Sequence, residues 1–131
     1  MKRSLNLAIL GIDHGHIFDM LDEMIKEGCN CNHFWTEGSP LTLNEFNKKY
    51  PNIKRVENKN EILKDNKIDM ILISSVPKDR ADLSIEALKS GKDVMVDKPG
   101  CTTLNQLNNL RRTVKETGKI WSVNFSERFH V

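Results

Sequence analysis

The sequence predicts an α/β fold, with an open, mainly parallel sheet that is doubly wound by helices on both of its faces. Apolar runs of strand length alternate with segments of helical period, which is typical of consecutive βαβ units. Some of these runs are almost continuous, as expected of strands that are covered on both faces. The 131 residues are enough for one domain with a real core, so we expect a single domain over residues 1–131.

The first half of the chain contains the clearest strand and helix. Residues 5–10 form an apolar run interrupted only by Asn6, and a helical segment follows. That helix ends before Gly28, and its apolar face consists of Ile17, Met20, Leu21, Met24 and Ile25. Three shorter elements come next: a strand over residues 31–36, a helix over 43–50 that Pro51 ends, and a strand over 53–56.

The second half continues the alternation of strands and helices. Residues 70–74 are apolar almost throughout, which predicts a strand buried on both faces. A helix then closes at Gly91, and its inner face consists of Ala81, Ile85 and Leu88. Residues 94–96 and 120–125 are predicted as the last two strands.

A final helix is predicted between those two strands. The hydroxyl group of Thr102 or Thr103 is suited to cap its first turn, and Gly118 follows its end. We expect the inward side chains to be Leu104, Leu107, Leu110 or the stem of Arg111, and Val114. The chain contains no internal repeat, low-complexity tract or linker, which agrees with one domain.

Composition excludes several classes of function. Lysine and arginine number 20 against 18 acidic residues and are interspersed, so we expect no nucleic-acid partner, which would need a basic stripe. Residues 5–10 are too few to span a membrane and precede no small-residue cleavage site, so neither membrane insertion nor export is indicated. The three cysteines, an odd number without a framework spacing, indicate reduced thiols and a cytoplasmic protein.

The turn after the first strand, at residues 11–16, lies where open α/β sheets bind their ligands. It offers backbone N–H groups and a positive helix end to a diphosphate. Of the usual GxGxxG fingerprint only Gly11 matches in register, because Asp13 and His16 replace the later glycines. We expect Asp13 to cap the helix through the amides near Gly15 or His16. His14 and His16 can then donate hydrogen bonds to phosphate oxygens.

Two other interpretations of this turn stay open. In one it is only a helix cap with two partly exposed histidines. In the other it begins a metal site, because a His-x-His pair directly after a strand does so in several metallohydrolases. That site would draw on Asp13, His14, His16, Cys29, Cys31 and His33. A parallel sheet places the two cysteines at the opposite edge from the turn, so we favour the nucleotide site and expect no metal.

The end of the second strand carries the expected acid of a dinucleotide site. Glu37 stands some twenty residues beyond the turn, where a carboxylate accepts hydrogen bonds from ribose hydroxyls. A carboxylate there repels the 2′-phosphate of NADP, so Glu37 favours NAD. Two alternatives remain: Thr36 is the true end of the strand and discriminates little, or Glu37 is a solvated loop acid.

Two later turns leave the same predicted edge of the sheet. Ser75 and Pro77 follow the fourth strand, where the fixed backbone of the proline either shapes a wall of the cleft or only forms a turn. Asp97, Lys98 and Pro99 follow the fifth strand. The ammonium of Lys98 can reach a substrate hydroxyl or carbonyl there, and partial desolvation would suit it to move a proton.

These motifs together resemble the N-terminal domain of the glucose-fructose oxidoreductase, inositol dehydrogenase and rhizopine-catabolism (Gfo/Idh/MocA) oxidoreductases. Residues 68–77 resemble that family's fourth strand and its proline, and residues 87–94 resemble its AL-x-x-GK-x-V stretch. Residues 97–99 are similar to its EKP motif, and residues 124–129 to the segment that ends in an Arg-Phe pair. The resemblance covers nearly the whole chain and implies a Rossmann-like NAD(P)-binding domain.

The resemblance also implies roles for single residues. Lys98 corresponds to the lysine implicated in substrate binding and proton transfer, Gly11 to the first fingerprint glycine, and Glu37 to the ribose-binding acid. The family's C-terminal substrate domain is missing from these 131 residues, so we expect cofactor binding without appreciable turnover. An apolar surface meant for that domain would also allow self-association as a homo-oligomer.

The sequence thus predicts the nucleotide-binding domain of an NAD(P)-dependent dehydrogenase that acts on a sugar, polyol or related hydroxy compound. A non-catalytic nucleotide-binding or partner-docking module is the first alternative, because the glycine turn is imperfect. A metal-binding, hydrolase-like protein that uses Asp13, His14 and His16 is the second.

Overall fold

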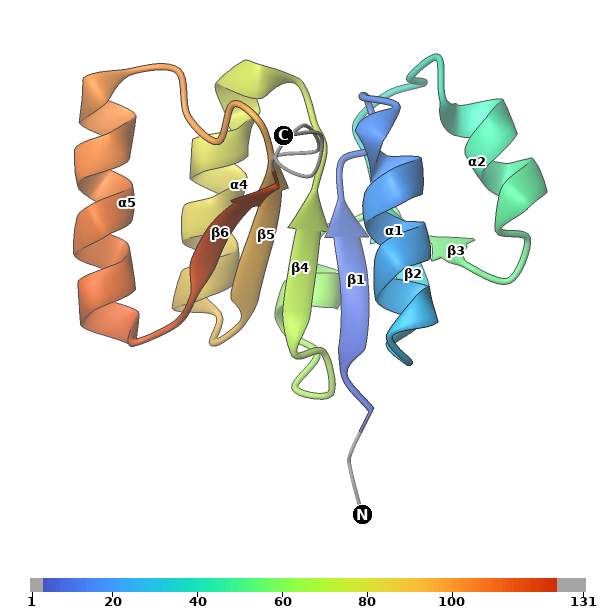
Figure 1. The fold of residues 1–131 in the computed structure, drawn as a ribbon, viewed down its shortest axis with the longest axis horizontal. Helices are drawn as coiled ribbons and strands as arrows, with labels where there is room; N and C mark the ends of the chain where they lie inside the picture. The colour runs from blue at the N-terminus through green and yellow to red at the C-terminus, as the bar shows by residue number, and fades with distance from the viewer. Residues whose placement is uncertain (1–3, 125–131) are drawn as a thin grey trace, which may run out of the picture.

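The computed structural model describes residues 4–124, which form alternating strands and helices. The strands are β1 (Asn6–Leu10), β2 (Asn30–Trp35), β3 (Lys54–Arg55), β4 (Met70–Ile73), β5 (Asp93–Asp97) and β6 (Trp121–Asn124). The helices are α1 (His16–Lys26), α2 (Leu43–Lys49), α3 (Asn60–Leu63), α4 (Pro77–Lys89) and α5 (Leu104–Thr117). The strands join in the order β3-β2-β1-β4-β5-β6, and each neighbouring pair is parallel (Figure 1).

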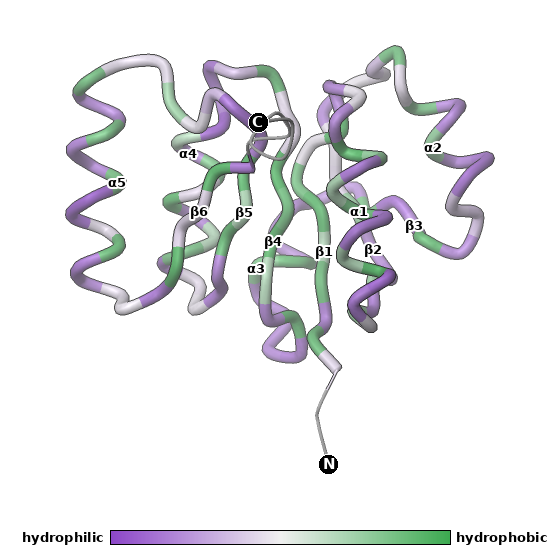
Figure 2. The backbone as a smooth tube through the Cα atoms, in the orientation of Figure 1, coloured by the Kyte–Doolittle hydropathy of each residue, from purple (hydrophilic) through white to green (hydrophobic). Residues whose placement is uncertain are grey.

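Each face of the sheet carries its own apolar cluster. Alternate side chains of a strand point to opposite faces, so Leu7 and Ile9 of β1 pack with α1 and α2, whereas Ala8 and Leu10 pack with α3, α4 and α5. The central strands are apolar along nearly their whole length, whereas the helices alternate between apolar and polar residues (Figure 2). The predicted doubly wound α/β fold is therefore confirmed.

The ends of α4 and α5 follow from local chemistry. Pro77 occupies the first turn of α4, where its missing N–H costs no hydrogen bond. At α5 a capping box forms, in which the Thr103 hydroxyl accepts from the Gln106 amide at 3.1 Å and the Gln106 side chain accepts from the Thr103 amide at 3.2 Å. Gly118 ends α5 with a φ of 69°. Of the two predicted caps, Thr103 is the one that the helix uses.

Some sequence expectations are wrong in detail. Ile25 and Leu104 were expected to face inward but are 41% and 72% exposed. Each lies in a terminal turn of its helix, where the sheet gives less cover. Ile120 precedes β6 and is 64% exposed, and Phe125 lies outside the described residues. The other predicted strand ends differ by at most one residue, and the four-residue α3 was missed because it is too short to show a period.

No helix within residues 4–124 is both long and apolar enough to cross a membrane. The longest, α5, has 14 residues, whereas a membrane-spanning helix needs about 20. The helices instead bury one side against the sheet, which leaves the carboxyl ends of the strands as the edge where loops gather.

Candidate functional site

The carboxyl ends of β1, β2, β4 and β5 lie along one edge of the sheet because the strands are parallel. The turn after β1 and the turn after β5 meet there, and the His16 Nδ1 atom lies 2.9 Å from the Asp97 Oδ1 atom. The amide of His14 also donates to the Ser74 carbonyl after β4 at 3.0 Å. The expectation that residues 11–16 and 97–99 lie side by side is confirmed.

Gly11 is fixed in its place by backbone geometry. Its φ is +92°, and a Cβ atom there would lie 2.5 Å from the Ser75 Cβ atom. Its amide donates to the Trp35 carbonyl at 2.7 Å, and its carbonyl accepts from the Ser74 amide at 3.1 Å. Only glycine fits between β2 and β4 at this point. Gly15 differs, since an added Cβ would meet no atom within 4 Å.

Asp97 is the centre of a buried polar cluster. Its side chain is fully buried, and its Oδ1 atom faces His16. The Oδ2 atom accepts a hydrogen bond from the Ser74 hydroxyl at 3.1 Å and lies 3.4 Å from His14 Nδ1 and 3.6 Å from the Arg80 guanidinium. The carboxylate that the sequence assigned to cofactor contact therefore faces protein groups, and it orients the histidines of the first turn.

Arg80, which sequence reasoning missed, joins the turns after β4 and β5. It is 1% exposed and donates to the Ser75 carbonyl at 2.8 Å and to the carbonyls of Asp97 and Pro99, each at 3.2 Å. Burial lowers the pKa of its guanidinium, and the charge of Asp97 opposes that shift. The apolar pattern of the helix gave no signal for it, because Ser84, four residues further on and also buried, is polar as well.

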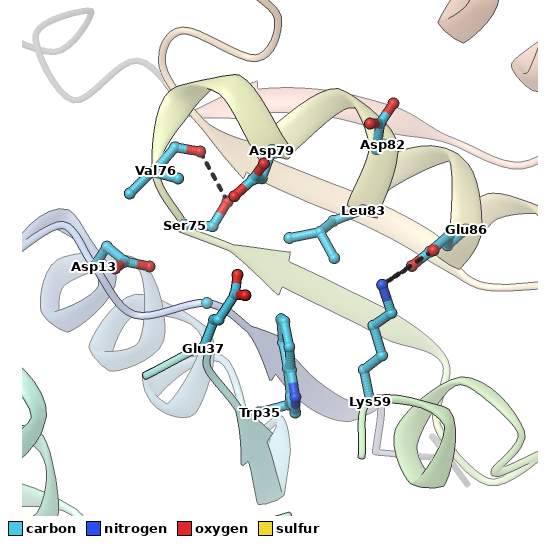
Figure 3. Close-up of a pocket in the computed structure, with 11 residues that line it drawn as sticks. Asp13, Trp35, Glu37, Lys59, Ser75, Val76, Asp79, Asp82, Leu83 and Glu86 are labelled. Carbon is cyan, nitrogen blue, oxygen red and sulfur yellow. Dashed lines mark hydrogen bonds and ion pairs between the residues drawn. The ribbon is translucent and has the colours of Figure 1, made fainter. Parts of the chain in front are cut away.

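A pocket of about 360 Å³ opens beside this cluster, between β1, the end of β2 and α4 (Figure 3). It is strongly acidic: the carboxylates around it belong to Asp13, Glu37, Asp79, Asp82 and Glu86. Trp35 and Leu83 supply apolar walls, and the buried Ser75 contributes to the lining as well. Glu37 and Ser75 are thus sequence-predicted residues that the fold brings together here.

Lys59 is the basic residue of the pocket lining, and an acid on α4 holds it. Its Nζ atom lies 2.9 Å from Glu86 Oε2 and 5.7 Å from the centre of the Trp35 ring. Trp35, Lys59, Asp79 and Asp82 were all missed by sequence reasoning. Trp35 could have been found, because it is the last residue of a strand at the ligand-binding edge.

Asp13 lines the pocket and does not cap α1, which corrects the sequence expectation. Gly15 occupies the N-cap position without a side-chain cap, and the His16 amide donates instead to His14 Nδ1 at 3.2 Å. Burial raises the pKa of the Asp13 carboxyl, and the negative charges of Asp79 and Glu37 raise it further. Asp13 therefore belongs to the acidic pocket and not to the helix terminus (Figure 3).

The remaining predicted residues lie at the same edge but are open to solvent. Lys98 directly follows β5 and is exposed, so the expected partial desolvation is not met in the described part of the chain. A cis peptide bond joins it to Pro99. Pro77 is exposed at the start of α4 and is absent from the pocket lining, where Val76 stands instead, which favours the alternative that the proline only forms a turn.

The metal-ligand set suggested by the sequence is only partly assembled. Cys31 lies in β2 and pairs with Leu7 near the amino end of β1, away from the turn after β1. Burial raises the pKa of the Cys31 thiol to about 12, which disfavours the thiolate that binds metals. In residues 4–124 the histidines of the turn gather with Asp97 instead of Asp13 or the cysteines.

Comparison with known proteins gives consistent matches. The model of an oxidoreductase family with an NAD-binding Rossmann fold matches residues 8–125. A scyllo-inositol 2-dehydrogenase (NAD(+)) of Bacillus subtilis is 36% identical over 69 residues, which are 53% of this chain and 20% of that enzyme. A crystal structure from Erwinia carotovora atroseptica, assigned as an oxidoreductase, superposes with a TM-score of 0.92 at 33% identity over 98% of this chain.

A more distant structure shares the fold alone. Biliverdin reductase from Synechocystis, solved with biliverdin and NADP+, superposes with a TM-score of 0.77 at 19% identity over 92% of this chain. This chain covers 37% of that structure and 38% of the Erwinia structure. It therefore spans well under half of the length of the proteins that it matches.

Proposed function

This chain belongs to the Gfo/Idh/MocA family of oxidoreductases, whose NAD-binding Rossmann domain it contains, and from that premise we propose how it holds its cofactor. The dinucleotide lies across the carboxyl edge of the sheet, with its diphosphate at the turn of residues 11–16 and its adenosine in the acidic pocket. The observation that carries this proposal is the junction of the turns after β1, β4 and β5 through Asp97.

The diphosphate is held by the positive end of α1 and by two histidines. The Nδ1 atoms of His14 and His16 face Asp97, so the Nε2 atoms on the far side of each ring face outward. The two side chains are 52% and 38% exposed, which leaves their outer edges open to phosphate oxygens. The imidazoles thus replace some of the backbone contacts that a glycine-rich turn would give.

The adenosine lies in the pocket beside Gly11. Glu37 stands two residues beyond the end of β2, where its carboxylate accepts hydrogen bonds from the ribose hydroxyls. Trp35 and Leu83 offer apolar surface to the base (Figure 3). In this proposal Glu37 binds the ribose, and Trp35 and Leu83 form the apolar surface beside it that binds the base.

The cofactor is NAD in preference to NADP. Glu37 faces a pocket that Asp13 and Asp79 also line; burial raises the pKa of the Asp13 carboxyl, and the negative charges of Asp79 and Glu37 raise it further. A 2′-phosphate would add one to two negative charges among them, at a cost that rises as the charges approach. The NAD(+)-linked name of the Bacillus subtilis relative agrees with this choice.

Lys98 serves the redox step on a sugar, polyol or related hydroxy compound. It lies at the same edge, one residue beyond Asp97, and its side chain is exposed. Hydride transfer needs a dry pocket that orients the substrate, and misplacement lowers the rate steeply. In this proposal the described residues supply the cofactor side of such a pocket.

Fluorescence titration with NADH and NADPH tests this proposal directly. We expect saturable binding of one NADH per chain, at least about tenfold tighter than NADPH, a difference of about 1.4 kcal/mol. A Lys98→Ala variant serves as a comparison and should keep its NADH affinity within about twofold, because Lys98 acts on substrate. If neither nucleotide binds saturably, the proposed function is wrong. If Lys98→Ala abolishes binding, its assigned role is wrong.

A further inference from the structure

The cluster of His14, His16 and Asp97 has the composition of a metal site. One ligand atom from each residue lies within 4.8 Å of the other two. The Nδ1 atom of His16 lies 2.9 Å from the Oδ1 atom of Asp97, and the Nδ1 atom of His14 lies 3.4 Å from the Oδ2 atom. Ligand atoms bound to one tetrahedral zinc ion lie roughly 3.3 Å apart, given its bonds of about 2.0–2.2 Å. The three side chains are thus close enough together for small side-chain shifts to bring one ligand atom of each onto a single ion.

The nitrogen of His14 that would bind an ion already presents a lone pair. His14 Nδ1 accepts a hydrogen bond from the His16 amide, which requires that this nitrogen carry no proton. On the other ring, His16 Nδ1 faces the Asp97 carboxylate and would exchange its proton for the metal. An incoming ion therefore replaces the hydrogen bond from the His16 amide to His14 Nδ1 and the proton between His16 Nδ1 and Asp97, and it needs no rearrangement of the backbone.

Asp97 is held in place by groups behind it. The Ser74 hydroxyl donates to its Oδ2 atom at 3.1 Å, and the Arg80 guanidinium lies 3.6 Å away, which leaves the Oδ1 atom toward His16. Such outer contacts fix a ligating carboxylate and raise the affinity of metal sites. The histidine rings are partly exposed, so water or an oxyanion can complete the coordination shell.

We propose that His14, His16 and Asp97 bind one divalent transition-metal ion of the zinc class at the carboxyl edge of the sheet. Two imidazoles and a single carboxylate suit zinc, whereas magnesium and calcium prefer sites built from several oxygen ligands. The nearby positive charge of Arg80 further disfavours a hard cation that binds through charge alone. This site goes beyond the proposed nucleotide function, which uses no metal.

Calorimetric titration of ZnCl2 into the tag-free chain, without nucleotide, tests the site. We expect one zinc ion per chain and no comparable binding of MgCl2. His14→Ala and His16→Ala should each weaken zinc binding by about 100-fold or more, since even outer-shell changes cost about 10–100-fold. Both side chains are partly exposed, so both variants should keep the circular dichroism of the parent.

His33→Ala and Cys29→Ser are the matched controls, because both residues belong to the ligand set that the structure does not assemble. They should bind zinc as the parent does. Absence of stoichiometric zinc binding in the parent overturns the proposal, and so does a loss in His33→Ala equal to that in His16→Ala. Because no nucleotide is present, a failure of NADH binding leaves this measurement unaffected.

Discussion

Two neighbouring regions of the same sheet edge use charge in opposite ways. Around Asp97, each charge has partners: the carboxylate meets Arg80, Ser74 and the histidines, and both Asp97 and Arg80 are almost completely buried. In the adjacent pocket of about 360 Å³, Lys59 is paired with Glu86, but burial raises the pKa of the Asp13 carboxyl, and the negative charges of Asp79 and Glu37 act on that carboxyl and raise its pKa further. The first region satisfies its charges internally and fixes the backbone, whereas the second leaves its charges to meet a ligand.

Among the variants proposed for these two regions, Arg80→Met should have the largest effect, which is a loss of stability in the cluster around Asp97. The change removes three hydrogen bonds to carbonyls and leaves the buried Asp97 without its guanidinium. We expect the free energy of unfolding to fall by about 3–5 kcal/mol, measured by urea denaturation. Arg111→Met, at an exposed position of α5, is the control and should change stability by less than about 0.5 kcal/mol. Equal effects of the two variants would refute a special role for the buried cluster.

Gly11→Ala tests the close packing of the turn that lies between the cluster around Asp97 and the acidic pocket. The new Cβ would enter the Ser75 side chain, and the positive φ alone costs about 1–3 kcal/mol for a residue other than glycine. Thermal unfolding should reveal this loss, together with weaker NADH binding. Gly15→Ala has open space and a helical φ of −64°, so it should leave the stability within about 0.5 kcal/mol of the parent. A stable Gly11→Ala variant would contradict the close packing described for this turn.

Neutral variants of the acidic pocket should change nucleotide preference with little effect on stability. Glu37→Gln and Asp79→Asn each remove a charge that would repel a 2′-phosphate. We expect the NADPH affinity to rise about tenfold in each, with NADH affinity reduced for Glu37→Gln alone through its ribose contacts. Glu23→Gln on the exposed side of α1 is the control. Unchanged NADPH affinity in both pocket variants would place the adenosine elsewhere.

Asp13→Asn should give the smallest effect, which depends on pH. Because the folded pKa of Asp13 lies above its ordinary value of 3.8, ionisation destabilises the folded chain, and this loss appears as pH rises through the folded pKa. The variant should therefore be more stable than the parent near pH 7, by less than about 1 kcal/mol given the partial exposure. Urea midpoints measured toward acid pH should converge. A difference that grows toward acid would reverse the sign and contradict the assignment.

The sequence was sufficient for the features that depend on local pattern. Continuous apolar runs located β1 and β4, and Gly11 was found because a strand-to-helix turn needs a glycine there. The resemblance to a known family was confirmed as well.

Features that depend on distant partners could not be predicted. His16 and Asp97 are 81 positions apart, and no local pattern reports their contact. The expectation for Asp13 was wrong because helix capping and pocket lining compete for the same carboxylate, and the fold decides between them. Arginine is rarely buried, so the burial of Arg80 could be found only from the structure.

Arg80 donates hydrogen bonds to three backbone carbonyls, so this one side chain helps to fix two separate loops at the carboxyl edge of the sheet. The guanidinium donates to the carbonyl of Ser75, which lines the acidic pocket, and to the carbonyl of Pro99, which follows Lys98. If the loop after β4 or the loop after β5 moves, it strains the hydrogen bonds through which Arg80 joins the two loops. Arg80 therefore couples the position of the acidic pocket to that of the turn that carries Lys98, so that a ligand bound at either end of the edge meets a backbone that the other end helps to fix.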